Sequence, residues 1–231
     1  LLRNRIVPMR GGAPPPPPIA SSNEPPQFQV DAAWPRDLPN NWILGQVSGI
    51  AVGPNDHIWI VHRPRTVTTR EAGAAQNPPL STCCVPAPSV IEFDQEGNVV
   101  RAWGGPSAGG GANGEQTAAY WPESEHGITV DAQGNLWIAS NGRGDQVVLK
   151  FSPEGRQLLQ IGRVGENAGS NDTMRLGQPT AVDVDVSANE VYVADGYRNR
   201  RVIVFNATTG AYKRHWGASG RRPVDGDTAA P

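Results

Sequence analysis

One sequence pattern occurs three times in this chain and restricts the folds that the chain can adopt. The clearest copy runs from His126 to Ser140 and places two short apolar segments on either side of the turn Gln133-Gly134-Asn135. Apolar segments around such a turn are typical of a β-hairpin. Related copies occupy residues 48–62 and 180–195. We therefore expect a chain built from repeated antiparallel strand pairs.

A second hairpin follows each copy, so that every repeat contains four strands. Phe93, Phe151 and Phe205 fall at one position of this repeat and are 58 and 54 residues apart. Repeats of about 40 to 50 residues with four strands each are the signature of β-propeller blades. We predict an all-β fold of about three four-stranded blades over residues 46–217.

The number of blades carries a further expectation. Closed propellers have roughly four to eight blades, and an open array leaves strand edges and apolar faces uncovered. We therefore predict that the chain is part of a six-bladed ring, or that a protein partner covers its open edge. Residues 218–231 are expected to begin the next blade or to form a tail.

Composition excludes some functions. The 231 residues carry a formal net charge of −2, and only 18% of them are charged, which argues against nucleic acid or an anionic membrane as partner. No apolar run approaches the ~18 residues of a membrane span. The 27 glycines and 22 prolines fit a fold with many turns.

Two segments lie outside the repeat. Residues 1–45 contain the run Pro14–Pro18, which favours an extended polyproline arm that either docks on another protein or acts as a tether. An insertion at residues 63–87 contains Cys83 and Cys84, the two cysteines of the chain. They can form a disulfide with each other, pair with another chain, or remain thiols.

One histidine stands out against the repeat. His126 begins the first strand of its blade, where Ser48 and Thr180 occupy the other copies. A catalytic zinc takes three protein ligands and keeps one open position, and a six-bladed ring can supply three histidines from alternate blades. The alternative is a hydrogen-bonded structural histidine at the end of a strand.

Several motifs of the chain resemble the NHL-repeat propellers, and among them the peptidyl-α-hydroxyglycine α-amidating lyases. The resemblance covers about residues 49–217. It is most specific in these segments: His126-Gly127-Ile128, Gln178-Pro179-Thr180-Ala181-Val182, and Val193-Ala194-Asp195-Gly196-Tyr197-Arg198-Asn199-Arg200-Arg201.

The resemblance implies roles for three residues. His126 corresponds to a zinc ligand, Tyr197 to a catalytic tyrosine, and Arg63 to a catalytic-site arginine. The implied reaction is zinc-dependent cleavage of a peptidyl α-hydroxyglycine to a peptide amide and glyoxylate, and a structural calcium is implied as well. A disulfide of the family corresponds here to Gly177 and Arg198, so the chain lacks it.

These observations leave two hypotheses for function. The first is a propeller that acts as a binding or structural module in an exported or envelope-associated assembly. The second is a zinc-dependent lyase-like enzyme. The adjacent cysteines, few lysines and loops rich in Gly, Pro and Asn favour export in either case.

Overall fold

The computed structural model describes residues 28–106, 120–165 and 167–226. The described residues from 33 onward form one compact unit, and residues 28–32 belong to a separate one. The predicted polyproline arm at Pro14–Pro18 therefore lies outside the described residues. No helix of the described segments is long and apolar enough to cross a membrane.

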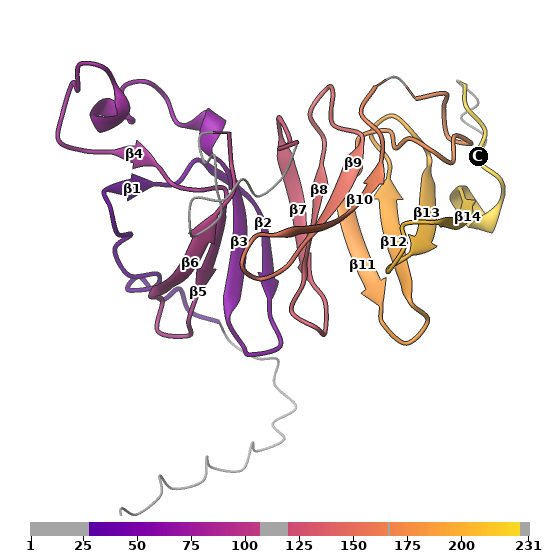
Figure 1. Cartoon of the computed structure of the whole chain (residues 1–231), viewed down its shortest axis with the longest axis horizontal. Helices are drawn as coiled ribbons and strands as arrows, with labels where there is room; N and C mark the ends of the chain where they lie inside the picture. Colours follow the sequence, from indigo (N-terminus) through magenta and orange to yellow (C-terminus); the bar gives the residue numbers. More distant parts are fainter. Residues whose placement is uncertain (1–27, 107–119, 166, 227–231) are drawn as a thin grey trace, which may run out of the picture. The chain divides into compact units, whose positions relative to one another are not determined.

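Three antiparallel sheets of four strands each form the compact unit, and they follow one another in chain order (Figure 1). The first blade contains β2 (Gln46–Val52), β3 (Ile58–Arg63), β5 (Val90–Phe93) and β6 (Val99–Trp103). The second contains β7 (Glu125–Val130), β8 (Leu136–Ser140), β9 (Val147–Phe151) and β10 (Gln157–Gly162). The third contains β11 (Ala181–Asp185), β12 (Glu190–Asp195), β13 (Arg201–Asn206) and β14 (Tyr212–Trp216).

Every blade has the strand order of a meander, with each strand paired to its sequence neighbour in the blade. This arrangement confirms the predicted all-β propeller fold with three blades. The six-bladed ring stays a prediction.

Apolar side chains fill the space between successive blades. Trp59 and Trp103 of the first blade pack with Leu149 and Phe151 of the second. Trp137 of the second blade packs in turn with apolar residues of the third. Because strand side chains alternate between the two faces of a sheet, each blade presents one apolar row to each neighbour.

The other face of the first blade is covered by the segment that precedes it. Trp34, Leu38, Trp42 and Leu44 pack against a buried row that includes Phe93. The rings of Trp34 and Phe93 lie 5.5 Å apart between centroids. Residues 34–44 thus cover the face of the first blade that a preceding blade would otherwise cover.

The insertion also returns to this covering segment. Its strand β4 (Val85–Pro86) pairs in parallel with β1 (Trp42–Ile43). The remaining regular elements are three short 3₁₀ turns: η1 (Pro64–Thr66), η2 (Gly73–Ala75) and η3 (Ala218–Gly220). Cys83 and Cys84 form a disulfide with each other within the insertion.

Candidate functional site

His126 lies in a β-bulge at the start of β7. Glu125 is opposite Ser140 and Gly127 is opposite Ala139, so His126 is the extra residue between two regular pairs. Bulges re-aim a side chain and are common beside active sites. The first blade has the same irregularity between Val47 and Gly49, so the repeat supplies the bulge and the sequence supplies the imidazole.

Glycine is required next to this histidine. A Cβ atom on Gly127 would lie 2.5 Å from the backbone oxygen of Thr180 in the next blade. The close approach brings that oxygen within 2.9 Å of His126 Nδ1. A side chain at residue 127 would therefore separate the two blades at the site.

The Thr180 contact sets the tautomer of His126. A backbone oxygen can only accept, so Nδ1 carries the proton and donates it to Thr180 O. Nε2 then has a free lone pair. Orientation of a histidine by a hydrogen bond from its other nitrogen is the usual arrangement of a metal-binding or proton-accepting imidazole.

Tyr197 lies at this free nitrogen. Its phenol oxygen is 3.3 Å from His126 Nε2, and the two rings meet edge-on with centroids 5.6 Å apart. Tyr197 is 60% exposed, so a substrate can reach its oxygen from solvent. The structure thus brings together two residues that are 71 positions apart in the sequence.

A buried ion pair holds the loop that carries Tyr197. Asp195 accepts hydrogen bonds from Gly177 N (2.6 Å), Asn199 Nδ2 (2.7 Å) and Arg201 Nε (2.9 Å). The side chains of Asp195 and Arg201 are fully buried. Arg198 N donates to Gly177 O at 2.9 Å, so the two positions of the missing family disulfide are joined by the backbone instead.

Arg63 reaches the same strand from the first blade. Its Nε donates to the backbone oxygen of Glu125 at 2.7 Å, which places the guanidinium beside the residue that precedes His126. Nη1 makes a long contact of 3.5 Å with Gln46 Oε1. The structure therefore brings Arg63, His126 and Tyr197 to one end of the blades.

His62, the neighbour of Arg63, has a structural position. The repeat aligns it with Ser140 and Asp195 and predicts a place near a loop face, but its side chain is fully buried. Nδ1 accepts from Gly45 N (3.1 Å) and Nε2 donates to Pro88 O (2.8 Å), which fixes a neutral ring. Burial lowers the pKa of His62, and the hydrogen bond to Pro88 opposes that shift.

Glu125 was not singled out by the sequence, although it adjoins the site. Its side chain is 1% exposed. Oε1 accepts from Ser89 Oγ (2.6 Å) and Trp121 Nε1 (2.7 Å). Oε2 has no hydrogen-bond partner among the described residues. The signal available in the sequence was an acidic residue at the start of an apolar strand.

The described residues provide one candidate metal ligand but no complete metal site. His126 has the orientation of a ligand, but the described residues contain no group of three His, Cys, Asp or Glu that could hold a metal ion. Zinc and structural calcium stay predictions.

Comparison with curated proteins finds relatives that are named as amidating enzymes. No model of a known protein family matches the chain. Peptidyl-glycine alpha-amidating monooxygenase B of Xenopus laevis is 28% identical over 207 residues, which are 84% of this chain and 20% of that protein. The probable peptidyl-alpha-hydroxyglycine alpha-amidating lyase pgal-1 of Caenorhabditis elegans is 29% identical over 169 residues, or 71% of this chain and 42% of that protein.

Among solved structures, a streptogramin B lyase aligns with 77% of this chain and 42% of its own, with 11% identity and a TM-score of 0.44. The chain spans less than half the length of the curated relatives given above. Fold and site define a β-propeller with a histidine–tyrosine pair at one end of its blades. The relatives, one named as an alpha-amidating monooxygenase and one as a probable alpha-amidating lyase, confirm the resemblance to proteins of the amidating-lyase family.

Proposed function

We propose that the chain is the propeller of a lyase that cleaves peptidyl α-hydroxyglycine to a peptide amide and glyoxylate. The observation that carries the proposal is the contact between His126 Nε2 and the Tyr197 phenol, with Nδ1 held by Thr180. The resemblance to proteins named amidating lyases supports the same reaction. The activity of those whole proteins is a proposal for this shorter chain.

The proposed reaction moves one proton from the substrate hydroxyl to the amide nitrogen. The substrate hydroxyl loses its proton, the C–O bond becomes the carbonyl of glyoxylate, the C–N bond breaks, and the amide nitrogen takes a proton. Tyr197 and His126 are a donor–acceptor pair of the kind that performs general acid–base catalysis. The Tyr197 oxygen takes the proton of the substrate hydroxyl while its own phenol proton passes to the departing amide nitrogen, so that the phenol is regenerated and the lone pair of His126 Nε2 stays available for a metal.

Arg63 supplies the positive charge that the substrate requires. The α-hydroxyglycine ends in a carboxylate, and guanidinium groups bind carboxylates through two parallel hydrogen bonds. The contacts of Arg63 with Glu125 O and Gln46 use Nε and Nη1. Nη2 has no protein partner among the described residues, and Nη1 keeps a second N–H, so these two nitrogens are the donors offered to the substrate carboxylate.

His126 is the residue of this chain that would hold zinc. A zinc ion bound there would supply Lewis acidity toward the substrate oxygen. The proposal further includes export of the protein, which the disulfide between Cys83 and Cys84 supports.

The direct test is the rate of glyoxylate release from an N-acyl-α-hydroxyglycine. We expect Tyr197→Phe to lower kcat by about 10²- to 10⁴-fold, the range for loss of a general acid or base. Tyr212→Phe is the matched control, because Tyr212 is paired with His215 at 2.8 Å on the outermost strand. Equal rates for Tyr197→Phe and Tyr212→Phe would refute the role of Tyr197.

Metal content gives a readout that does not depend on turnover. Elemental mass spectrometry of the purified protein should find zinc that is lost in His126→Ala and kept in His215→Ala. Zinc that is unchanged in His126→Ala would remove this residue from the ligand set.

A binding module remains the second candidate. It is favoured by exposed apolar side chains on β2, where Ile50 is 65% exposed and Val52 is 62% exposed. Protein that forms no glyoxylate from any α-hydroxyglycine substrate would leave this candidate in place.

A further inference from the structure

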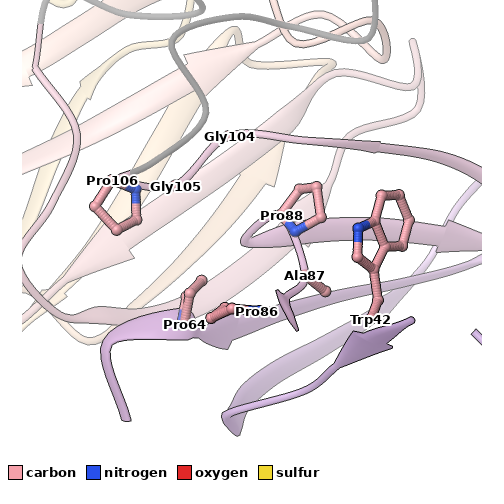
Figure 2. Close-up of a pocket in the computed structure, with 8 residues that line it drawn as sticks. All are labelled: Trp42, Pro64, Pro86, Ala87, Pro88, Gly104, Gly105 and Pro106. Atoms are coloured by element: carbon pink, nitrogen blue, oxygen red, sulfur yellow. The ribbon is translucent and has the colours of Figure 1, made fainter. Parts of the chain in front are cut away.

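An apolar cavity of about 220 Å³ lies next to Arg63. Figure 2 shows the indole of Trp42 and several prolyl rings around one space. Its walls come from four separate parts of the chain and are Trp42, Pro64, Pro86, Ala87, Pro88, Gly104, Gly105 and Pro106. The cavity is smaller than the roughly 300–1,000 Å³ of pockets that enclose a drug-sized ligand, and it suits one bulky apolar side chain.

Hydrogen bonds hold these walls in place without a ligand. Ala87 N donates to Ile43 O at 3.0 Å, and Ser89 N donates to Gly104 O at 3.2 Å. The buried His62 holds Pro88 in place, because His62 Nε2 donates a hydrogen bond to the carbonyl oxygen of Pro88. A preformed pocket loses little conformational entropy when a ligand binds.

The cavity lies beside the proposed site but is separated from it by side chains. Pro64 follows Arg63 directly, and a Cβ on Gly105 would lie 2.9 Å from Ser89 Oγ, which in turn bonds to Glu125. Glu125 precedes His126. One layer of side chains therefore separates the apolar walls from the groups proposed to hold the reacting end of the substrate.

We propose that this cavity is a substrate subsite that takes an apolar residue, proline included, located close to the α-hydroxyglycine of a peptide. The inference rests on the proposed lyase function. Aromatic rings line the grooves that bind proline-rich peptide segments, and the Trp42 indole supplies such a wall here beside the prolyl rings. Arg63 holds the carboxylate end, and the cavity beyond Pro64 receives a side chain from the preceding part of the peptide.

The test compares substrates that differ only in the residues preceding the α-hydroxyglycine. Acetylated tripeptides ending in α-hydroxyglycine carry Leu or Pro at the preceding positions in one set and Ser or Asp in the other. We expect about tenfold higher kcat/KM for the apolar set, since small changes in an apolar pocket are worth about 10- to 200-fold in specificity. Trp42→Ala should abolish this preference and leave kcat/KM for acetyl-α-hydroxyglycine unchanged.

A second variant guards against loss of folding, because Trp42 also packs on the first blade. Pro106 lies at the exposed rim, and Pro106→Asp should reduce the preference without touching the core. Pro79→Asp, on the exposed part of the insertion, is the control and should change nothing.

The outcomes separate the two proposals. Turnover of acetyl-α-hydroxyglycine with equal kcat/KM for both tripeptide sets would overturn the subsite and leave the lyase intact. If no substrate is turned over, the lyase fails, and calorimetric binding of the product amides decides the subsite. Leu- and Pro-containing amides that bind tighter than Ser- or Asp-containing ones in a Trp42-dependent way support it, and equal or absent binding overturns it.

Discussion

Replacing Asp195 by alanine should destabilise the protein more than any other single loss of a carboxylate near the site. Asp195 and Arg201 are buried together, and the aspartate also accepts from Gly177 N and Asn199 Nδ2. Asp195→Ala leaves the guanidinium without a counter-ion and two further donors without an acceptor. The loop that holds Tyr197 depends on all three contacts.

The magnitude follows from the burial of the pair. Truncating one partner of a buried ion pair costs about 3–5 kcal/mol. Arg201 keeps the backbone oxygens of Ser170, Asp172 and Arg175 as acceptors, which places the expected loss near 3 kcal/mol. With a urea m-value of about 2–3 kcal/mol/M, the unfolding midpoint should fall by roughly 1 M or more.

Urea unfolding followed by tryptophan fluorescence measures this loss. Asp183→Ala removes the same charge from an exposed strand position and should stay within about 0.5 kcal/mol of the wild type. The double variant Asp195→Ala/Arg201→Met should be more stable than Asp195→Ala, because it removes the unpaired charge. Equal midpoints for Asp195→Ala and Asp183→Ala would refute the reasoning.

Three further outcomes follow from the structure. Burial lowers the pKa of His62 from 6.5, so the unfolded chain binds protons more readily, and stability should fall as the pH drops below about 6.5; His62→Gln should reduce this dependence of the urea midpoint. Trp34→Ala should cost about 1–3 kcal/mol by uncovering the apolar face of the first blade, whereas Phe28→Ala, at a residue 91% exposed, should leave the midpoint unchanged. Cys83 and Cys84 are joined, so mass spectrometry should find neither alkylated by iodoacetamide until a reductant is added.

The blades could be predicted because their signals are local. Alternating apolar residues and tight turns repeat within each hairpin, and Gly134 takes the positive φ of 82° that its turn requires. Strand pairing then follows from the order of the hairpins. The three-blade fold needs no information from distant residues.

The cover on the first blade could not be predicted in the same way. Trp34, Leu38, Trp42 and Leu44 follow neither the period of a strand nor that of a helix, and they pack individually. Their contacts depend on an apolar face that only exists once the blade has formed. The sequence did offer one signal for this cover, since the segment expected to be an extended arm contains two tryptophans.

The repeat pointed to His126 and the resemblance to amidating lyases pointed to Tyr197 and Arg63, but neither predicted the geometry that joins them. His126 differs from Ser48 and Thr180 at one position of the repeat, which identified it. The tautomer depends on a backbone oxygen of the next blade, and no sequence pattern encodes that contact. The burial of Asp195 likewise needs Arg201 and the preceding loop in place.

The most direct measurement is product analysis with the full chain and a peptide that ends in α-hydroxyglycine. We predict equal amounts of peptide amide and glyoxylate by mass spectrometry, formed faster than in buffer, and no product from the same peptide ending in plain glycine. Product formation at the rate of buffer alone would contradict it.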